Sequence, residues 1–489
     1  MPSYLWALTH LGLAVWGVYH VLLYKRDPQS ALGWIMACVF IPWGGPLAYF
    51  LFGINRVKKR AKGLRGRFSV GREGGRPHEP APDQNRDPSS DQSSDQSADP
   101  TDDAAVQVPG VAAMAAAHIS GRPARAGNHL RVLHNGETAY PAMLAAIDAA
   151  RERVWLATYI FQGGRTGEAF VDALSAAADR GLDVRVLVDG VGERYAWRRA
   201  SVRLRRRGVP VARFLPPSLV PPSLSLNLRN HRKLLVTDGS DAFLGGMNLS
   251  DDHRDWPDRP RTITDVQFHA QGPLVMDLAG LFARDWHFVT GETLAPQAAG
   301  GRQEEAGDAL CRMVPDGPDA DLDALAVTIM AMASSARHQI DIMTPYFLPS
   351  RELLSALQSA ALRGVRVRIV LPAVNNLVYV HWANRNLLAD LLWWDVQVFY
   401  QPAPFCHSKL LCIDDAYVLI GSANLDPRSL RLNFEVGVEI VSEPLNQQLR
   451  DHFDAVIATS SALTLEQLGA RSVLVRLRDS AAALLSPYL

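Results

Sequence analysis

Two long apolar runs open the chain. YLWALTHLGLAVWGVYHVLLY, from Tyr4 to Tyr24, has no formally charged residue and is long enough to span a bilayer, which takes about 20 apolar residues. A second run extends from Ala31 to Ile54, where Pro42 and the Gly44–Pro46 stretch predict a kink. No basic residue precedes the first run and no small-residue cleavage site follows it, which argues against a signal peptide. The pattern predicts a transmembrane hairpin within residues 1–60.

The charges that flank these runs predict an orientation. NRVKKRAKGLRGR, residues 55–67, is densely basic and outweighs Lys25 and Arg26 in the connecting turn. The positive-inside rule then places the rest of the chain in the cytoplasm. The basic segment could also contact anionic head groups, although a topology signal is the preferred interpretation. The following polar, acidic stretch, rich in Pro and Ser, predicts a disordered linker over residues 61–128, serving mainly as a spacer.

Beyond residue 128 the periodicity alternates between helix and strand. GEAFVDALSAAADRG, residues 167–181, has a helical pattern and leads into LDVRVLVDG, which is typical of a buried strand. RELLSALQSAALRG, residues 351–364, leads into VRVRIVLP in the same order. The alternation predicts a mixed, partly parallel sheet with helices on its faces. We expect an α/β fold of two pseudo-symmetric sandwich halves, residues 129–300 and 301–489, with a site where they meet.

A gapless repeat links the two halves. HRKLLVTDGSDAFLGGMNL occupies residues 231–249 and HSKLLCIDDAYVLIGSANL occupies residues 407–425, a constant offset of 176 positions (407 − 231). The histidine, the lysine, the Leu-Leu pair, the aspartate, a glycine, the asparagine and the final leucine coincide. A match over this length indicates an internal duplication.

The spacing within each copy predicts a shared face. Residues i and i+2 of a strand point to the same side, so each histidine should lie beside its lysine. The aspartates have the opposite parity and begin a turn, which predicts contacts with backbone or with the partner half rather than a role as bases. The asparagines should return to the histidine face on the next strand. The residues concerned are His231, Lys233, Asp238 and Asn248 in the first copy and His407, Lys409, Asp414 and Asn424 in the second.

Two histidines facing each other suit in-line phosphoryl transfer. One imidazole can attack phosphorus and the other can protonate the leaving alcohol, while lysines and amides neutralise the non-bridging oxygens. A metal site is poorly supported, because each lysine would repel a cation and no carboxylate shares the face. Glu435 and Asp265 follow the motifs on strand-like segments and could orient the histidines. Either could instead be a surface carboxylate, and for Asp265 the two interpretations have about equal weight.

Overall composition adds a few limits. The 489 residues carry a formal net charge of zero, so charge gives no reason to expect a nucleic-acid partner. The four scattered cysteines, Cys38, Cys311, Cys406 and Cys412, are typical of buried thiols in a reducing compartment. The apolar, Pro-rich SLVPPSLSL at residues 218–226 could dip into lipid or form a buried loop, and both interpretations stay open.

HxKxxxxD followed by Gly-x-x-Asn, present twice, resembles the signature of the phospholipase D superfamily. FLFGINRVKKR, NLRNHRKLLVTDG, TPYFLP, GSANLDPRSLRLNFE and the terminal LLSPYL resemble bacterial cardiolipin synthases. The resemblance implies a multi-pass protein of the bacterial inner (cell) membrane that needs no cofactor. It also implies transfer of a phosphatidyl group between two phosphatidylglycerol molecules through a phosphatidyl-histidine, with release of glycerol.

The resemblance also implies roles for single residues. His231 would be the nucleophile and His407 the general acid and base, with Glu435 orienting a histidine. The phosphate-binding positions would be Lys233, Lys409, Asn248 and Asn424, and the motif aspartates Asp238 and Asp414 belong to the same catalytic signature.

Some positions depart from the family pattern. Ile-Thr-Asp replaces Trp-Arg-Asp before Asp265, Asp395 stands where a glycine is usual, and Asn375 and Asn376 stand where an aspartate is common. The last two departures leave the identity of the acceptor open.

Other functions also stay open. They are hydrolysis to phosphatidic acid and transfer to another acceptor such as phosphatidylethanolamine. A nuclease is disfavoured by the neutral charge and the apolar runs, and an inactive membrane scaffold by the presence of both histidines and both lysines. The sequence does not predict an oligomeric state.

Overall fold

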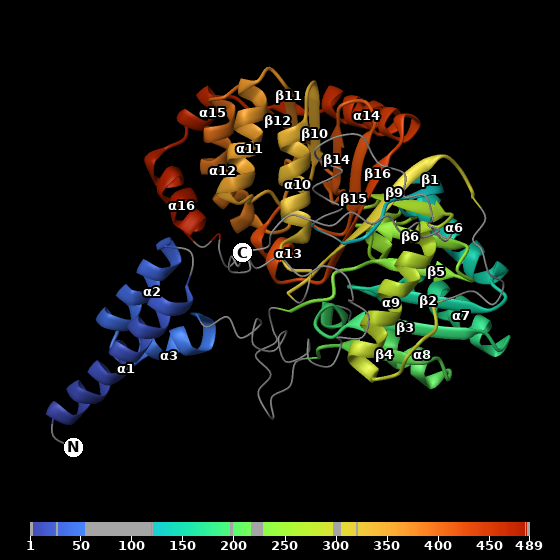
Figure 1. Cartoon of the computed structure of the whole chain (residues 1–489), viewed down its shortest axis with the longest axis horizontal. Helices are drawn as coiled ribbons and strands as arrows, with labels where there is room; N and C mark the ends of the chain where they lie inside the picture. The colour runs from blue at the N-terminus through green and yellow to red at the C-terminus, as the bar shows by residue number, and fades with distance from the viewer. Residues whose placement is uncertain are drawn as a thin grey trace, which may run out of the picture.

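The computed structural model shows an N-terminal helical hairpin and an α/β body (Figure 1). It describes residues 3–25, 28–53, 119, 121–195, 199–216, 228–296, 305–318, 321–484 and 486. The basic segment at 55–67, the apolar loop at 218–226 and the linker at 61–128, apart from residues 119 and 121–128, lie outside the described residues.

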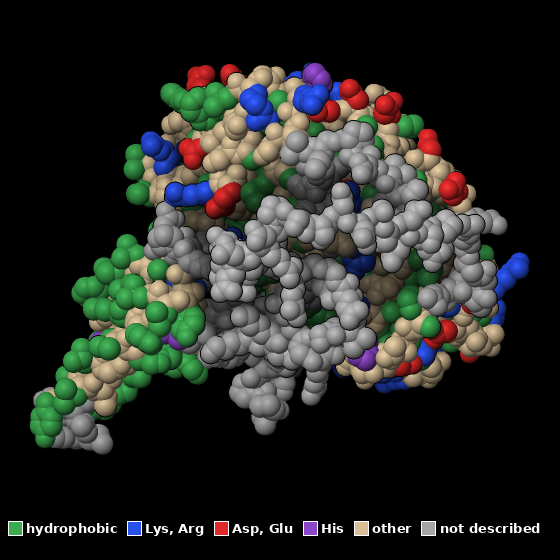
Figure 2. Space-filling view, in the orientation of Figure 1, with side chains coloured by type: hydrophobic (Ala, Val, Ile, Leu, Met, Phe, Trp, Pro, Cys, Tyr) green, Lys and Arg blue, Asp and Glu red, His purple; other side chains and the backbone are tan. Residues whose placement is uncertain are grey.

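The hairpin has a small buried core and a large apolar surface. Its elements are α1 (Ser3–Tyr24), α2 (Pro28–Phe40), α3 (Gly44–Ala48) and the π-helical turn η1 (Tyr49–Gly53). Val21, Cys38 and Tyr49 form the buried cluster, and His20 Nδ1 lies 2.8 Å from Tyr49 Oη. Most other large apolar side chains are exposed, and Figure 2 shows them covering the hairpin. Such a surface is suited to lipid.

The second apolar run does not form the continuous spanning helix that its composition predicts. α2 contains 13 residues, about 20 Å at 1.5 Å per residue, against a hydrocarbon core of about 30 Å. The predicted kink is a full break, since the helix stops before Ile41 and Trp43 has a φ of 61°. Among the described residues one helix, Trp6–Tyr24, is long and apolar enough to cross a membrane.

The first half follows the predicted alternation. Its strands are β1 (Arg125–His134), β2 (Arg153–Thr158), β3 (Asp183–Asp189), β4 (Val211–Phe214), β5 (Leu234–Thr237), β6 (Asp241–Gly245), β7 (Ile263–Thr264) and β8 (Val266–Gln271). Its helices are α6 (Asn135–Ala149), α7 (Arg165–Asp179), α8 (Ala200–Arg206) and α9 (Leu274–Thr290), with 3-10 turns η2 (Gly192–Tyr195) and η4 (Asp251–His253). β1 begins at Arg125, before the expected boundary at residue 129, because its first residues pair with the second half.

The second half repeats this order and adds C-terminal helices. Its strands are β9 (Ala309–Asp316), β10 (Gln339–Met343), β11 (Arg366–Pro372), β12 (Gln397–Gln401), β13 (Phe405–Cys406), β14 (Leu410–Ile413), β15 (Tyr417–Gly421), β16 (Glu435–Val441) and β17 (Ser461–Ala462). Its helices are α10 (Ala324–Ser335), α11 (Arg351–Leu362), α12 (Val378–Leu392), α13 (Pro427–Arg431), α14 (Glu443–Ala458), α15 (Leu465–Gly469) and α16 (Val473–Leu484).

The strand order shows the duplication directly. One sheet runs β17-β12-β11-β10-β14-β15-β16-β9-β1-β8-β6-β5-β2-β3-β4, and the halves join where β9 and β1 pair antiparallel. From that junction the order β8, β6, β5, β2, β3, β4 matches β16, β15, β14, β10, β11, β12. β2, β3 and β4 run parallel, as do β10, β11 and β12, so the sheet is mixed, as predicted.

Three hydrophobic clusters explain why the halves face each other. α6, α7 and α8 cover the outer face of the first-half strands, and α10, α11 and α12 cover that of the second. The central cluster contains side chains from both halves, including Val236, Phe268 and Phe282 from one and Val418 and Phe453 from the other. Helices α9 and α14 therefore lie in the shared layer, and the predicted pair of α/β sandwiches is confirmed.

Two of the departures from the family pattern have a structural explanation. Asp395 precedes β12 with a φ of 61°, and Gly208 precedes β4 at the matching place with a φ of 78°. Backbone of this kind favours glycine, which accounts for the glycine that is usual at residue 395. Asn375 Nδ2 donates to Pro345 O at 3.0 Å, and Asn376 Oδ1 accepts from a tyrosine hydroxyl at 2.8 Å, so both asparagines brace the loop after β11.

Candidate active site

The two HxK segments lie directly before their strands. His231 and Lys233 precede β5, and His407 and Lys409 precede β14, so the prediction that they lie within strands is wrong by a few positions. Each pair nevertheless shares a side: Lys409 Nζ lies 3.2 Å from both ring nitrogens of His407, and Lys233 Nζ donates to His231 O at 2.6 Å.

The backbone of each segment pairs with the opposite half, which explains why it leaves its own sheet. His231 N donates to Phe434 O at 2.9 Å, and His407 N donates to Thr264 O at 2.8 Å. β13, just before His407, runs parallel to β7 of the first half. The histidines are therefore held at the contact between the halves.

Each histidine also receives its carboxylate from the opposite half. His231 Nδ1 lies 3.0 Å from Glu435 Oε1 and 3.1 Å from Oε2, and His407 Nδ1 lies 2.9 Å from Asp265 Oδ2. Glu435 is 0% exposed and Asp265 2% exposed, so the interpretation of either as a surface carboxylate is wrong. Since a carboxylate accepts, Nδ1 carries the hydrogen and Nε2 of each neutral ring keeps its lone pair.

Further hydrogen bonds keep both carboxylates ionised. Burial alone would raise the pKa of Glu435, but His231, Lys233 and the hydrogen bond from Ser422 Oγ hold it below its usual value. Ser422 Oγ donates at 2.5 Å and Asn433 Nδ2 at 3.0 Å. The pKa of Asp265 is likewise lowered, because the hydrogen bond from His407 and the positive charge of Lys409 outweigh burial.

Burial makes the histidines and lysines hard to protonate. It lowers the pKa of His407 to about 3, with the neighbouring Lys409 adding to the effect. The pKa of His231 is lowered mainly by burial, opposed by Glu435. Burial also lowers the pKa of Lys409 to about 8 and that of Lys233 well below its usual value. Both histidines are therefore neutral near pH 7.

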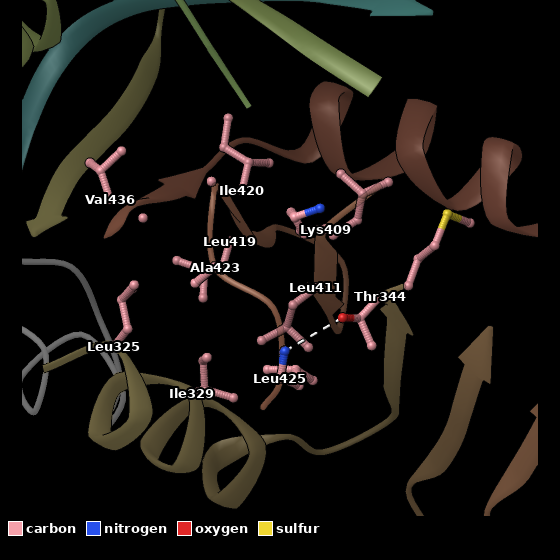
Figure 3. Close-up of a pocket in the computed structure, with 14 residues that line it drawn as sticks. Leu325, Ile329, Thr344, Lys409, Leu411, Leu419, Ile420, Ala423, Leu425 and Val436 are labelled. Carbon is pink, nitrogen blue, oxygen red and sulfur yellow. Dashed lines mark hydrogen bonds between the residues drawn. The ribbon is translucent and has the colours of Figure 1, made fainter. Parts of the chain in front are cut away.

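The surroundings of Lys409 account for its low pKa. A cavity of about 40 Å³ lies beside it, lined by apolar side chains of α10, β14 and β15 such as Leu325, Ile329, Leu411 and Leu419 (Figure 3). The lysine thus projects toward the site from an apolar wall, where an ammonium ion loses hydration and gains by meeting an anion.

The two motif asparagines lie buried in the loops that follow β6 and β15. Asn248 Oδ1 accepts from Ile160 N at 3.2 Å, which leaves its amide group as a donor. Asn424 Nδ2 donates to Ser429 Oγ at 3.1 Å, and its Oδ1 has no hydrogen-bond partner among the described residues.

The motif aspartates do not join the catalytic group to which the signature assigns them. Asp238 and Asp414 lie at the far ends of β5 and β14, in turns with φ of 53° and 49°. Each carboxylate accepts from three successive backbone N–H groups at the start of a neighbouring strand: those of Arg151, Glu152 and Arg153, and those of Arg337, His338 and Gln339. They fix β2 and β10 within their own half, so of the two contacts predicted for them the one with backbone is confirmed.

Two neighbours of the site were not singled out from the sequence. Arg232, between His231 and Lys233, is fully buried: it donates to Asp285 Oδ2 at 2.7 Å and to Glu435 O at 2.9 Å. His253 is buried with its ring centre 6.4 Å from that of His407, and its Nδ1 has no hydrogen-bond partner among the described residues. In the sequence, Arg232 could have been noticed as a charged residue just before an apolar strand, whereas no sequence pattern points to His253.

The residues that the structure describes include no group of three or more His, Cys, Asp or Glu side chains that could hold a metal ion. All four cysteines are buried free thiols.

Comparison with known proteins agrees with this geometry. A family model described as "Cardiolipin synthase, PLD-like domain" matches residues 143–257 and 329–457, which include both HxK motifs. A model described as "Phospholipase_D-nuclease N-terminal" matches residues 12–53, the hairpin.

Relatives match along the whole chain. The major cardiolipin synthase of Bacillus subtilis is 30% identical, with 95% of each chain covered, and cardiolipin synthase A of Pseudomonas aeruginosa is 31% identical over 100% of this chain and 98% of its own. The crystal structure of phosphatidylserine synthase from Haemophilus influenzae Rd KW20 superposes with a TM-score of 0.59 at 16% identity, covering 77% of this chain and 100% of that one, which shows the fold alone.

Two α/β halves that bring a pair of HxK motifs into one buried site define the phospholipase D superfamily. The full-length matches narrow the class. The chain belongs to the cardiolipin synthase family, and it is accordingly an enzyme, a phosphatidyltransferase of the phospholipase D type.

Proposed function

We propose that the enzyme makes cardiolipin from two molecules of phosphatidylglycerol and releases glycerol. The observation that supports this most is the exchange of carboxylates, by which Glu435 and Asp265 each hold Nδ1 of a histidine of the opposite half and leave its Nε2 with a lone pair. Two such imidazoles in one buried site provide a nucleophile and a proton carrier for substitution at phosphorus.

In the first step Nε2 of His231 attacks the phosphorus of one phosphatidylglycerol. The bond from phosphorus to the head-group glycerol oxygen breaks, and that oxygen takes a proton from His407, so glycerol leaves. The product is a phosphatidyl group bound to His231. Glu435 stabilises the positive charge that His231 acquires, because it already holds the Nδ1 hydrogen.

In the second step a hydroxyl of the other phosphatidylglycerol attacks the same phosphorus. His407 takes the proton of that hydroxyl, the bond between phosphorus and Nε2 breaks, and His231 returns to its neutral form. Atoms and charge balance without a cofactor: two phosphatidylglycerols become one cardiolipin and one glycerol. Water in place of the hydroxyl would give phosphatidic acid, and another lipid alcohol would give a different phosphodiester.

Substrate entry prepares His407 to act as an acid. Lys409 Nζ lies 3.2 Å from the ring of His407 and contributes to its low pKa. A phosphodiester anion offers Lys409 a stronger partner and brings a negative charge beside the imidazole, and both effects raise the pKa of His407. Protonation of the acid is thereby coupled to occupancy of the site.

We further infer that the protein is a multi-pass protein of the inner membrane with its α/β body in the cytoplasm. α1 would cross the bilayer, and the broken segment α2–α3–η1 would return the chain, with the basic residues at 55–67 on the cytoplasmic side. A cysteine placed at the exposed Asp451 should react in intact cells only with a membrane-permeant reagent. Reaction with an impermeant reagent would reverse the orientation.

A reconstitution tests the reaction. Full-length protein in vesicles of labelled phosphatidylglycerol should form cardiolipin and free glycerol in equal amounts, and His231→Ala and His407→Ala should form neither. Rapid quenching in alkali, where phosphohistidine is stable, should recover a labelled protein from the wild type. Phosphatidic acid as the only product would make the enzyme a hydrolase, and turnover only with added phosphatidylethanolamine would change the acceptor.

A further inference from the structure

The C-terminal helix α16 presents an apolar stripe to the outside. Val473, Leu474, Leu477 and Leu484 are 68%, 78%, 61% and 80% exposed. Their spacing places them on one side of the helix. No described residue covers this stripe, although leucines on one face of an amphipathic helix are ordinarily the buried ones.

The buried face of α16 holds one charged residue, Asp479, and one small apolar residue, Ala482, which packs against Val380 and Ala383 of α12. Asp479 is 0% exposed and forms ion pairs with Arg385 of α12 at 3.5 Å, with Arg478 at 2.7 Å and with Arg471. Asn386 Nδ2 of α12 also donates to Ser480 Oγ at 3.1 Å. The helix is therefore attached to α12 through ion pairs, a hydrogen bond and the small apolar contact of Ala482, whereas its larger apolar side chains face outward.

Charge and position both point to a lipid surface as the occupant. Asp479 is the single acidic residue in α16 and is buried among arginines, whereas Arg476 is exposed. In the view of Figure 1, α16 lies at the edge of the body from which the hairpin projects, and the hairpin has the other large set of exposed apolar side chains. An apolar stripe flanked by arginines is the pattern of a helix that lies in an anionic membrane interface.

We propose that α16 docks on the anionic surface of the membrane that holds the hairpin, with Leu474 and Leu477 inserted among the lipids. The proposal rests on the proposed function, because it takes the enzyme to act on lipids of that membrane. Docking attaches the second half through α12 at a point distant in sequence from the hairpin. The enzyme then has two separate contacts with the bilayer, which limit how its site can turn relative to the head groups.

Fluorescence quenching in vesicles tests the docking directly. A polarity-sensitive label on Leu477→Cys, in the full chain reconstituted with phosphatidylglycerol and phosphatidylcholine, should lose about half of its emission or more when the phosphatidylcholine carries a doxyl quencher, as expected for a depth of about 5–10 Å. The matched control is Asp451→Cys on α14, which is exposed and distant from α16 in Figure 1. Label on the parent chain gives the background of its buried cysteines.

The result that overturns the proposal is equal quenching at the two positions. Blue-shifted emission at residue 477 that persists in detergent and does not respond to doxyl lipid would also overturn it, since a segment of this chain or a second copy would then cover the stripe.

A charged variant separates docking from catalysis. Leu474→Asp combined with Leu477→Asp should lower phosphatidyl transfer in vesicles about tenfold, because ionised carboxylates do not enter the interface. Its activity on short-chain phosphatidylglycerol in detergent should stay within about twofold of the wild type, which excludes misfolding. Full activity of this variant in vesicles would count against docking. If the wild type itself shows no transfer in either medium, the proposed function fails, while the quenching result still decides the docking.

Discussion

Replacement of Glu435 by glutamine is the most direct probe of the exchanged carboxylates. The side chain keeps its size, so the buried space is filled as before. An amide accepts hydrogen bonds only through its one oxygen, however. The two oxygens of the wild-type carboxylate accept from His231, Ser422 and Asn433 together. Whichever way the amide turns, its NH₂ group faces at least one donor.

The variant can avoid this clash of donors by changing the tautomer of His231, and His231 then cannot attack phosphorus. The ring can accept from the glutamine NH₂ through Nδ1, which moves its hydrogen to Nε2 and removes the lone pair that attacks phosphorus. The charge that stabilised the imidazolium is lost as well. Comparable partners of catalytic or metal-bound histidines are worth between about 10²- and 10⁴-fold in rate, or about 2.7–5.5 kcal/mol. We expect Glu435→Gln to lower kcat by an amount in that range and to leave KM within about threefold.

The assay is cardiolipin formation in vesicles, followed with labelled phosphatidylglycerol, beside rapid quenching for protein-bound label. Glu439→Gln is the matched control. Glu439 lies on the same strand and is buried, but its ion-pair partner is Arg312 at 3.7 Å, and burial raises its pKa to about 7, so replacing its carboxyl group by an amide near neutral pH changes its charge less than at Glu435. The control should keep its rate within about twofold, and the unfolding midpoint should confirm that both variants fold.

A Glu435→Gln enzyme with nearly normal kcat and normal protein-bound label would refute the reasoning. The contact between Glu435 and His231 would then be structural, and His407 with Asp265 would become the better candidate for the nucleophilic pair.

Three further outcomes follow from the same geometry. Since the pKa of Lys409 is about 8, kcat/KM should fall with pH more steeply above pH 8 than below it, by about a further tenfold per pH unit, as the ammonium loses its proton. The corresponding fall in kcat should begin at higher pH, because bound phosphate raises that pKa. A pH profile of kcat/KM that does not steepen between pH 8 and pH 10 would contradict this. Asp395→Gly should raise the free energy of unfolding by up to about 1 kcal/mol, and Gly208→Ala at the matching turn should lower it by about 1 kcal/mol or more, measured by thermal unfolding; equal midpoints would show that φ is not strained there. His253→Phe removes a buried nitrogen without a described partner, so it should leave the unfolding midpoint unchanged or higher while lowering transfer about tenfold; an unaffected rate would assign His253 to packing alone.

Much of the fold could be predicted because periodicity and duplication are local signals. The helix and strand patterns at residues 167–181 and 351–364 correspond to α7 and α11, each followed by a parallel strand. The second apolar run was harder. Hydropathy counts side chains and does not register where the backbone stops being helical, and the break at Ile41–Trp43 shortens α2 below a membrane span.

The composition of the site could be predicted, but its assembly could not. Spacing alone brings Lys409 beside His407, because the two residues are next-but-one neighbours in an extended segment. Nothing in the spacing tells that Glu435 serves His231 or that Asp265 serves His407. That exchange arises because residues 229–231 and 405–407 pair with the opposite half, a consequence of how two sheets pack rather than of any local pattern.

The exchange also explains why the two copies have diverged where they have. Gly246 and Ser422 occupy the same place in the repeat, and each lies beside the carboxylate of its own half. A Cβ on Gly246 would lie 3.0 Å from Asp265 Oδ2, so a serine there would crowd the short side chain, whereas Ser422 donates to the longer Glu435 at 2.5 Å. Gly246 thus leaves room for Asp265, and Ser422 hydrogen-bonds Glu435. In each half the residue at this position suits the carboxylate that contacts the histidine of the other half. The halves are related by duplication, yet each motif histidine takes its carboxylate from the other half, so the proposed catalytic centre exists only when both are folded against each other.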